Sequence, residues 1–173
     1  MLLPVVCRDQ DDRMNFPAGA LLIQQASHVI LNGLSFRRPP MLCGLNDVRP
    51  ARDSRTLLCA RPILARGTSP ASAQVALASK VYPVLVISTR PGERRAALMT
   101  DAAPHWCGGF VDWGSQRVAL TAAARSVAIP SAGDTSSPER TSPARSTVEV
   151  GDAYVRLCSG LIRWLAGSSK NFG

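Results

Sequence analysis

Residues 81–88 read VYPVLVIS, and this stretch says most about the fold. A short β-branched apolar run of this length is typical of a buried strand, although Pro83 cannot donate a hydrogen bond to a sheet ladder. Residues 89–92, TRPG, have the composition of a tight turn. Residues 93–100 then carry good helix formers behind an acidic first position. The sequence therefore predicts a strand, a turn and a helix over 81–100.

A turn between a strand and a helix is a place where a protein can hold an anion. Free backbone N–H groups at a helix N-terminus attract phosphate, and nearby arginines add positive charge. The glycine-rich fingerprints of nucleotide-binding loops are missing, and most such turns bind nothing. If the turn binds a phosphate-bearing ligand, the predicted anion-binding residues are Ser88, Thr89, Arg90, Arg94 and Arg95.

Helical spacing of apolar residues appears on both sides of this segment. One helix is expected over 17–34, capped by Asn15 and ended by Gly33. A second is expected over 153–166, with Gly167 where a C-terminal stop belongs. Residues 53–64 and 71–79 are compatible with short helices, and 110–113 with a second strand.

These elements together predict a small, irregular α/β fold. We expect a loose segment at 1–16, a small α/β domain at 17–129 with a basic loop at 37–70, and a helical segment at 148–173. Residues 130–147 combine Pro, Ser, Thr and Gly with no large apolar residue, which predicts a disordered linker. The alternative is a largely disordered chain with isolated helices.

The charge is unusual, with 20 basic residues against 12 acidic ones and a net charge of +8. All the basic residues except Lys80 and Lys170 are arginine, which favours phosphate partners, although GC-rich coding DNA produces the same bias. Residues 37–81 contain no aromatic residue for base stacking, so only backbone electrostatics would remain. The residues predicted to bind nucleic acid or another polyanion are Arg37, Arg38, Arg49, Arg52, Arg55, Arg61 and Arg66.

Catalytic and metal signatures are incomplete. His105 and Cys107 are the one base and nucleophile that stand close together, but they match no family pattern. The five cysteines form no C-x-x-C pair, so zinc-ribbon and thioredoxin-type readings fail on spacing. We expect no cofactor and no metal, and an enzyme is the less favoured reading.

The function is therefore left open among three hypotheses. The chain binds a phosphate-bearing ligand at 81–100, or it binds polyanions through the seven arginines, or it has no evolved biochemical role. The first residues lack a secretory pattern, and the longest apolar stretch is too polar for a comfortable membrane span. A cytoplasmic location is the default expectation.

Overall fold

The chain folds into curled antiparallel β-sheets with one α-helix. The computed structural model describes residues 3–8, 11–66, 74–101, 110, 113–114, 116–121 and 145–167. The elements in chain order are β1 (Val5–Cys7), β2 (Arg13–Gln24), the 3-10 turn η1 (Val29–Leu31), β3 (Met41–Asn46), β4 (Val48–Pro50), β5 (Ser54–Arg66), β6 (Gln74–Leu77), β7 (Tyr82–Ser88), β8 (Ala96–Leu98), β9 (Gln116–Thr121), β10 (Arg145–Val150) and α2 (Asp152–Leu165).

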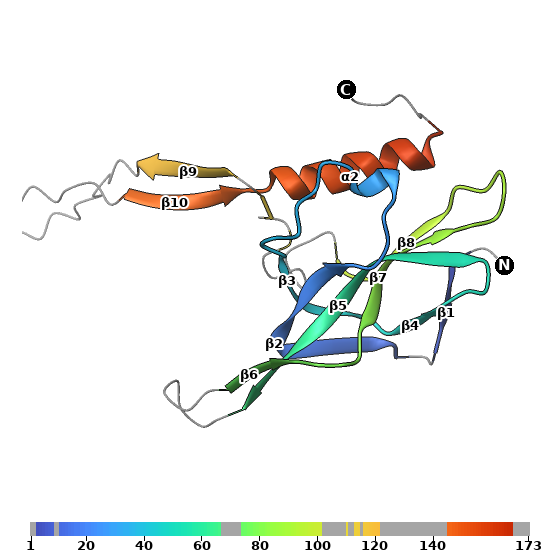
Figure 1. Ribbon diagram of the computed structural model, residues 1–173, viewed down its shortest axis with the longest axis horizontal. Coiled ribbons are helices and arrows are strands. Elements are labelled where there is room, and N and C mark those ends of the chain that lie inside the picture. Colours follow the sequence, from blue (N-terminus) through green and yellow to red (C-terminus); the bar gives the residue numbers. More distant parts are fainter. Residues whose placement is uncertain are drawn as a thin grey trace, which may run out of the picture.

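The main sheet has the strand order β3-β2-β5-β7-β8, and β6 pairs with the far end of β5. All of its pairings are antiparallel. The sheet curls into a half-barrel, visible in Figure 1. Its two edges meet beyond β8, where Asn46 N donates to Met99 O at 2.8 Å and Thr100 Oγ1 donates to Gly44 O at 3.0 Å. Two smaller ribbons, β1–β4 and β9–β10, complete the described sheets.

The core lies inside the half-barrel and consists mainly of aliphatic side chains. In β7 the whole run from Val84 to Ser88 is buried, which confirms the strand predicted at 81–88. Pro83 is tolerated because it pairs with Cys59 of β5 beyond the end of β8, next to an irregularity in the β5 register. Strand β7 is therefore held by burial on both of its faces.

The helix predicted at 17–34 is wrong, because this region holds β2, a loop and η1. Strand β2 pairs with β3 in two registers, with a shift between Asn15 and Ala20. Gly19 lies in that shift with a φ of +80°, a conformation that glycine adopts without strain. The apolar residues that predicted the helix, from Leu21 to Leu34, are divided among the end of β2, a loop and η1, so their helical spacing does not belong to one element.

The helix predicted at 93–100 is also wrong. Gly92 turns the chain with a φ of +76°, as a tight turn requires, and the segment after it forms β8. Ala97 of β8 pairs with Val86 of β7, so the unit is a hairpin. Pairing along an existing buried strand overrides the helix preference of Ala, Leu and Met.

The predicted α/β class is therefore wrong, and so is its largely disordered alternative. The short helices considered at 53–64 and 71–79 are replaced by β5 and β6. Of the linker predicted at 130–147, residues 145–147 belong to β10 and the others lie outside the described residues. The strand considered at 110–113 includes 111–112, which also lie outside them.

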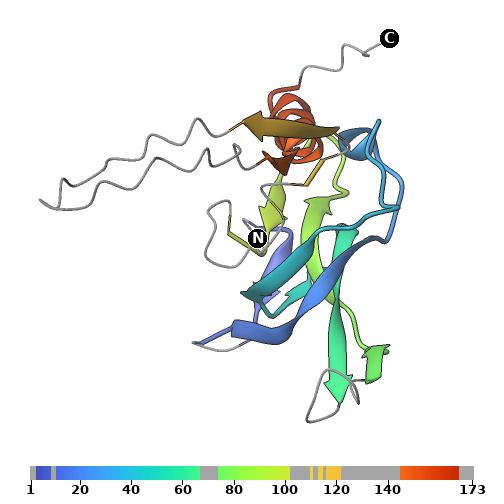
Figure 2. The ribbon, with the colours of Figure 1, turned by 90° about the vertical axis from the view of Figure 1, so that its left-hand side faces the viewer.

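The predicted C-terminal helix is confirmed as α2, which ends at Leu165 before Gly167 with a φ of +80°. It lies across one end of the half-barrel in both Figure 1 and Figure 2. Helix α2 packs on η1, and its Tyr154 joins an aromatic cluster with Phe110, Trp113 and Phe36. Gly160 makes this docking close, because an added Cβ would stand 2.7 Å from the carbonyl oxygen of Ile30.

Candidate functional site

The predicted anion site is the loop between β7 and β8, and its arginines already have partners within the protein. Arg90 donates from Nε to Asp53 Oδ2 at 3.0 Å, and its Nη2 lies at the same distance from that oxygen. Arg94 Nη1 donates to the carbonyl oxygen of Trp164 in α2 at 2.8 Å. Arg95 Nη2 lies 3.5 Å from Glu93 Oε1. An incoming anion would have to compete with these groups.

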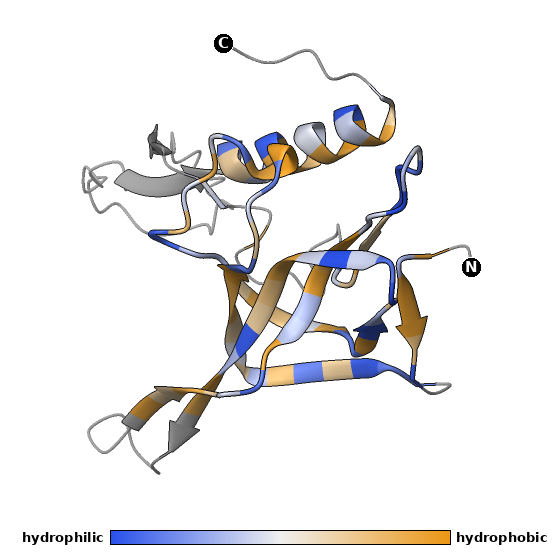
Figure 3. Ribbon diagram, turned by 45° about the vertical axis from the view of Figure 1, so that its right-hand side comes forward, coloured by the Kyte–Doolittle hydropathy of each residue, from blue (hydrophilic) through white to orange (hydrophobic). Residues whose placement is uncertain are grey.

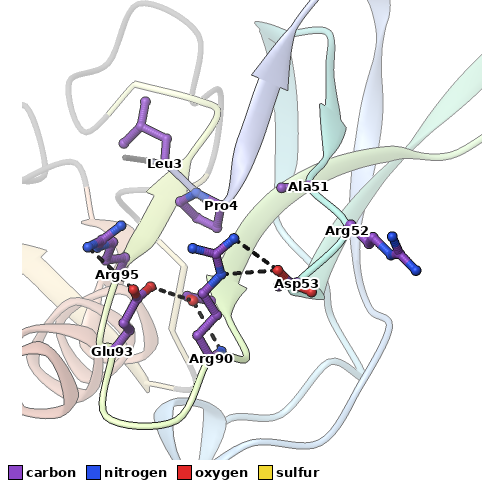
Figure 4. A pocket seen from close by; sticks show the side chains of 9 residues that line it. Leu3, Pro4, Ala51, Arg52, Asp53, Arg90, Glu93 and Arg95 are labelled. Carbon is purple, nitrogen blue, oxygen red and sulfur yellow. Dashed lines mark hydrogen bonds and ion pairs between the residues drawn. The ribbon is translucent and has the colours of Figure 1, made fainter. Parts of the chain in front are cut away.

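The same loop borders a small cavity of about 60 Å³, shown in Figure 4. Ser88 Oγ faces it, donates to Glu93 Oε2 at 3.3 Å and accepts from the backbone N–H of Arg90. The predicted helix N-terminus is absent here because β8 follows the loop. A cavity of this size can hold ordered water. Anion binding at Ser88–Arg95 stays a prediction.

The seven arginines predicted to bind polyanions are spread over several elements. Arg37 and Arg38 precede β3, Arg49 is in β4 and Arg52 is in the turn before β5. The others, Arg55, Arg61 and Arg66, lie along β5. Arg55 and Arg61 are six positions apart, which is roughly 20 Å along a strand. This arrangement gives no support to a nucleic-acid or polyanion partner.

The two contacts described for His28 do not involve a cysteine. His28 accepts a hydrogen bond from Ile30 N and contacts the Trp164 ring. Burial raises the pKa of the Cys59 thiol, an effect that the nearby Arg61 partly offsets. His105 and Cys107 lie outside the described residues. Within the described part of the chain, no group of three or more His, Cys, Asp or Glu residues could hold a metal ion.

An open cleft of about 490 Å³ lies beside the edge strand β8, and we call it the β8 cleft. Its buried lining residues are apolar, whereas its charged and amide side chains are exposed or half-buried. Residues from β1, β3, β4, β8 and the start of β2 contribute. The lining residues are Leu3, Val5, Cys7, Asp11, Asp12, Arg13, Asn46, Val48, Ala97 and Met99.

Alternate side chains of β1 line the β8 cleft, as the two-residue period of a strand requires. Leu3, Val5 and Cys7 share one parity and all line it, whereas Val6 points away. Opposite them, Val48 of β4 pairs with Cys7, and Ala97 and Met99 come from β8 and the residues after it. Figure 3 shows β1 as a strongly hydrophobic strand. The cleft thus has apolar walls on two sides.

The opening of the cleft carries an ion pair of two parallel hydrogen bonds. Arg13 donates from Nε to Asp11 Oδ1 at 2.8 Å and from Nη2 to Asp11 Oδ2 at 2.9 Å. These hydrogen bonds lower the pKa of Asp11 to about 2, and the same pair raises the pKa of Arg13. Both side chains are well exposed, at 70% for Arg13 and 63% for Asp11. Asp12 beside them accepts from the Arg8 N–H at 3.0 Å.

Sequence reasoning missed the β8 cleft, because residues 1–16 were expected to be a loose segment. The run Asp11-Asp12-Arg13 was a local sign of mixed charge there. The other lining residues come from positions as far apart as Leu3 and Met99, so no local pattern could have joined them.

The fold and the cleft define a mainly β protein with an open hollow beside the edge of a half-barrel, which is a common place for small-ligand sites. The chain belongs to the family described as putative glutamine amidotransferase, GATase1_like, whose model matches residues 1–121. No curated protein matches the chain.

Two solved structures from Salmonella typhimurium are similar to part of the chain. They are cytoplasmic protein STM3548, at 26% identity, and cytoplasmic protein STM1381 of strain LT2, at 25% identity, each with a TM-score of 0.43. Each match covers 61% of this chain and 35% of the other, so the chain spans about a third of their length. In the described ranges, no helix has the length and apolar character that crossing a membrane requires.

Proposed function

We propose that this chain binds a small zwitterionic molecule of the amino-acid class in the β8 cleft. The observation that carries the proposal is the exposed Asp11–Arg13 pair at the opening of an apolar cleft of about 490 Å³. A carboxylate and a guanidinium side by side complement a ligand that has both an ammonium and a carboxylate group. The volume falls within the usual range for small-molecule sites.

Exchange of partners is the physical basis of the binding. Exposed ion pairs are screened by water and contribute little to stability, so a ligand can separate Asp11 from Arg13 at small cost. The ligand carboxylate then binds the Arg13 guanidinium, and the ligand ammonium binds the Asp11 carboxylate. Leu3, which is 56% exposed, offers an apolar surface to the ligand's methylene groups.

The description of the family makes L-glutamine the first ligand to test. Because the chain spans about a third of the solved structures it matches, amidotransfer by this chain is part of the proposal only as a question for experiment. Membership of a family argues against the hypothesis of a chain with no evolved role.

Titration calorimetry with the full chain and L-glutamine tests the binding. Arg13→Met keeps the length of the side chain and removes its charge, so the affinity is expected to fall about tenfold or more, the loss of a charge-assisted pair. Arg38→Met is the matched control, because Arg38 is exposed in the loop before β3 and does not line the cleft. Absence of binding, or equal binding by wild type and Arg13→Met, would refute the proposal.

Ammonia release in the same samples separates binding from turnover. The cleft contains one thiol, that of Cys7, and an amide transfer through a thiol needs that nucleophile. Binding with no ammonia release supports a binding module. Release that disappears in Cys7→Ser would instead make the chain an enzyme acting at this cleft.

A further inference from the structure

His28 lies at the point where helix α2 meets the half-barrel. It is the N-cap residue of η1, and its Nδ1 accepts a hydrogen bond from the backbone N–H of Ile30 at 3.3 Å. On its other side the imidazole meets the Trp164 indole of α2 edge to face, with ring centres 5.5 Å apart. One half-buried side chain therefore joins η1 to α2.

The junction below His28 is closely packed. Ile30 and Leu31 of η1 are buried, and Gly160 of α2 comes so near that a Cβ there would stand 2.7 Å from Ile30 O. A small rearrangement of η1 would therefore move the surface on which α2 rests, because close-packed contacts do not deform continuously.

The charged groups on the elements around His28 are mostly cationic. Arg55 of β5 faces it and disfavours its protonated form, and Arg94 from the β7–β8 loop reaches the Trp164 carbonyl. The carboxylates of α2 and of the β7–β8 loop are engaged with arginines of their own, Asp152 with Arg156 at 3.9 Å and Glu93 with Arg95. The charged groups on α2 are Asp152, Arg156 and Arg163.

We infer that protonation of His28 loosens helix α2 from the half-barrel, so that η1 and α2 form a pH-sensitive latch. The cap requires Nδ1 as an acceptor, which exists only in the neutral imidazole with its proton on Nε2. Protonation turns Nδ1 into a donor that opposes the Ile30 N–H. It also adds a positive charge among the arginines. Both effects favour opening of the η1–α2 contact.

The expected direction follows from the titration of His28. Burial first, and Arg55 second, lower the pKa of His28 below its ordinary 6.5. A histidine whose pKa is lower when docked than when released binds its proton better in the released state. Docking is therefore strongest above about pH 6.5 and weakens as the pH falls from there toward the lowered pKa.

Hydrogen exchange of the full chain tests the latch. After correction for the intrinsic pH dependence, α2 amides are expected to lose protection between pH 7.5 and pH 5, while β5 and β7 amides keep theirs. His28→Asn keeps an oxygen acceptor that suits an N-cap and does not titrate, so its α2 protection should stay level with pH. Arg55→Gln removes the facing cation and should move the wild-type midpoint to higher pH.

Three results would overturn the inference. Wild-type α2 could keep its protection down to pH 5, or His28→Asn could show the same loss as wild type. Alternatively, α2 could become better protected at low pH, as attraction between an imidazolium and the Trp164 indole would produce. Level protection in His28→Asn together with a loss in wild type supports the latch.

Discussion

The half-barrel and helix α2 are both amphipathic, but they bury their apolar sides to different extents. Inside the half-barrel, Leu22, Leu58 and Leu85 are completely buried, and each lies in a strand that is hydrogen-bonded to its neighbours. Helix α2 buries Ala153 and Leu157, while Val155 and Ile162 on its other side are 60% and 65% exposed. The helix is thus attached along one line and should open before the sheet does.

The largest effect is expected from a cavity inside the half-barrel. Leu58→Ala removes a fully buried side chain of β5 and should lower the free energy of unfolding by about 2–5 kcal/mol. Urea unfolding followed by circular dichroism measures it. Val75→Ala in β6, where the side chain is 70% exposed, is the control and should change stability by about 0.5 kcal/mol or less. Equal losses would mean that the described core is not the source of stability.

A smaller and more local effect is expected at the seat of the helix. Gly160→Ala raises helix propensity by about 1 kcal/mol, but its Cβ would stand 2.7 Å from Ile30 O. Overpacking of this kind costs about 1–3 kcal/mol, so we expect net weakening of α2 docking. Hydrogen exchange of α2 should quicken while that of β5 is unchanged. Ser159→Ala, the neighbouring position, should not quicken it; tighter docking in Gly160→Ala would contradict the close approach.

The hydrogen bond from the β7–β8 loop to the end of α2 should contribute less to stability than the contact at Gly160. Arg94→Ala removes a cation from the C-terminal turn of α2 and should cost about 0.3–1 kcal/mol, less at high salt. The thermal melting temperature in low and high salt measures this difference. Arg38→Ala, another exposed arginine, is the comparison. The link to Trp164 would be irrelevant to docking if the two variants melted alike.

Phosphate should have the smallest effect, and it tests the anion site predicted at Ser88–Arg95. If that site exists, phosphate raises the melting temperature, and the double change Arg90→Ala with Arg94→Ala abolishes the rise. We expect a small rise, because Arg90 must leave Asp53 and Arg94 must leave the helix. A rise no larger than that in chloride of equal ionic strength would remove the site.

The parts of the fold that could be predicted are those whose local pattern survives in the tertiary structure. Strand β7 was predictable because its run from Val84 to Ser88 is buried, and α2 because nothing interrupts its 3.6-residue period. The region 17–34 was not, because its helical spacing of apolar residues runs across the end of β2, a loop and η1. Residues 93–100 were not, since pairing with β7 outweighed the helix preference of their side chains.

The candidate site could be predicted even less. The arginines of the β7–β8 loop were identified by type, but their partners Asp53 and Trp164 are distant in sequence. The β8 cleft collects residues from Leu3 to Met99, and its ion pair lies in a segment expected to be loose. Whether a charged side chain can bind a ligand depends on which groups the fold places beside it.

By itself the sequence determined the buried strand at 82–88, the turn at Gly92, the C-terminal helix and a net charge of +8. These are properties of composition and of short-range periodicity. Only the tertiary structure decided that the sheet curls until Asn46 meets Met99, that a cleft opens beside β8, and which arginines are already paired. The physical reason is that strand pairing, curling and charge pairing join residues far apart in the chain, and no local pattern records them.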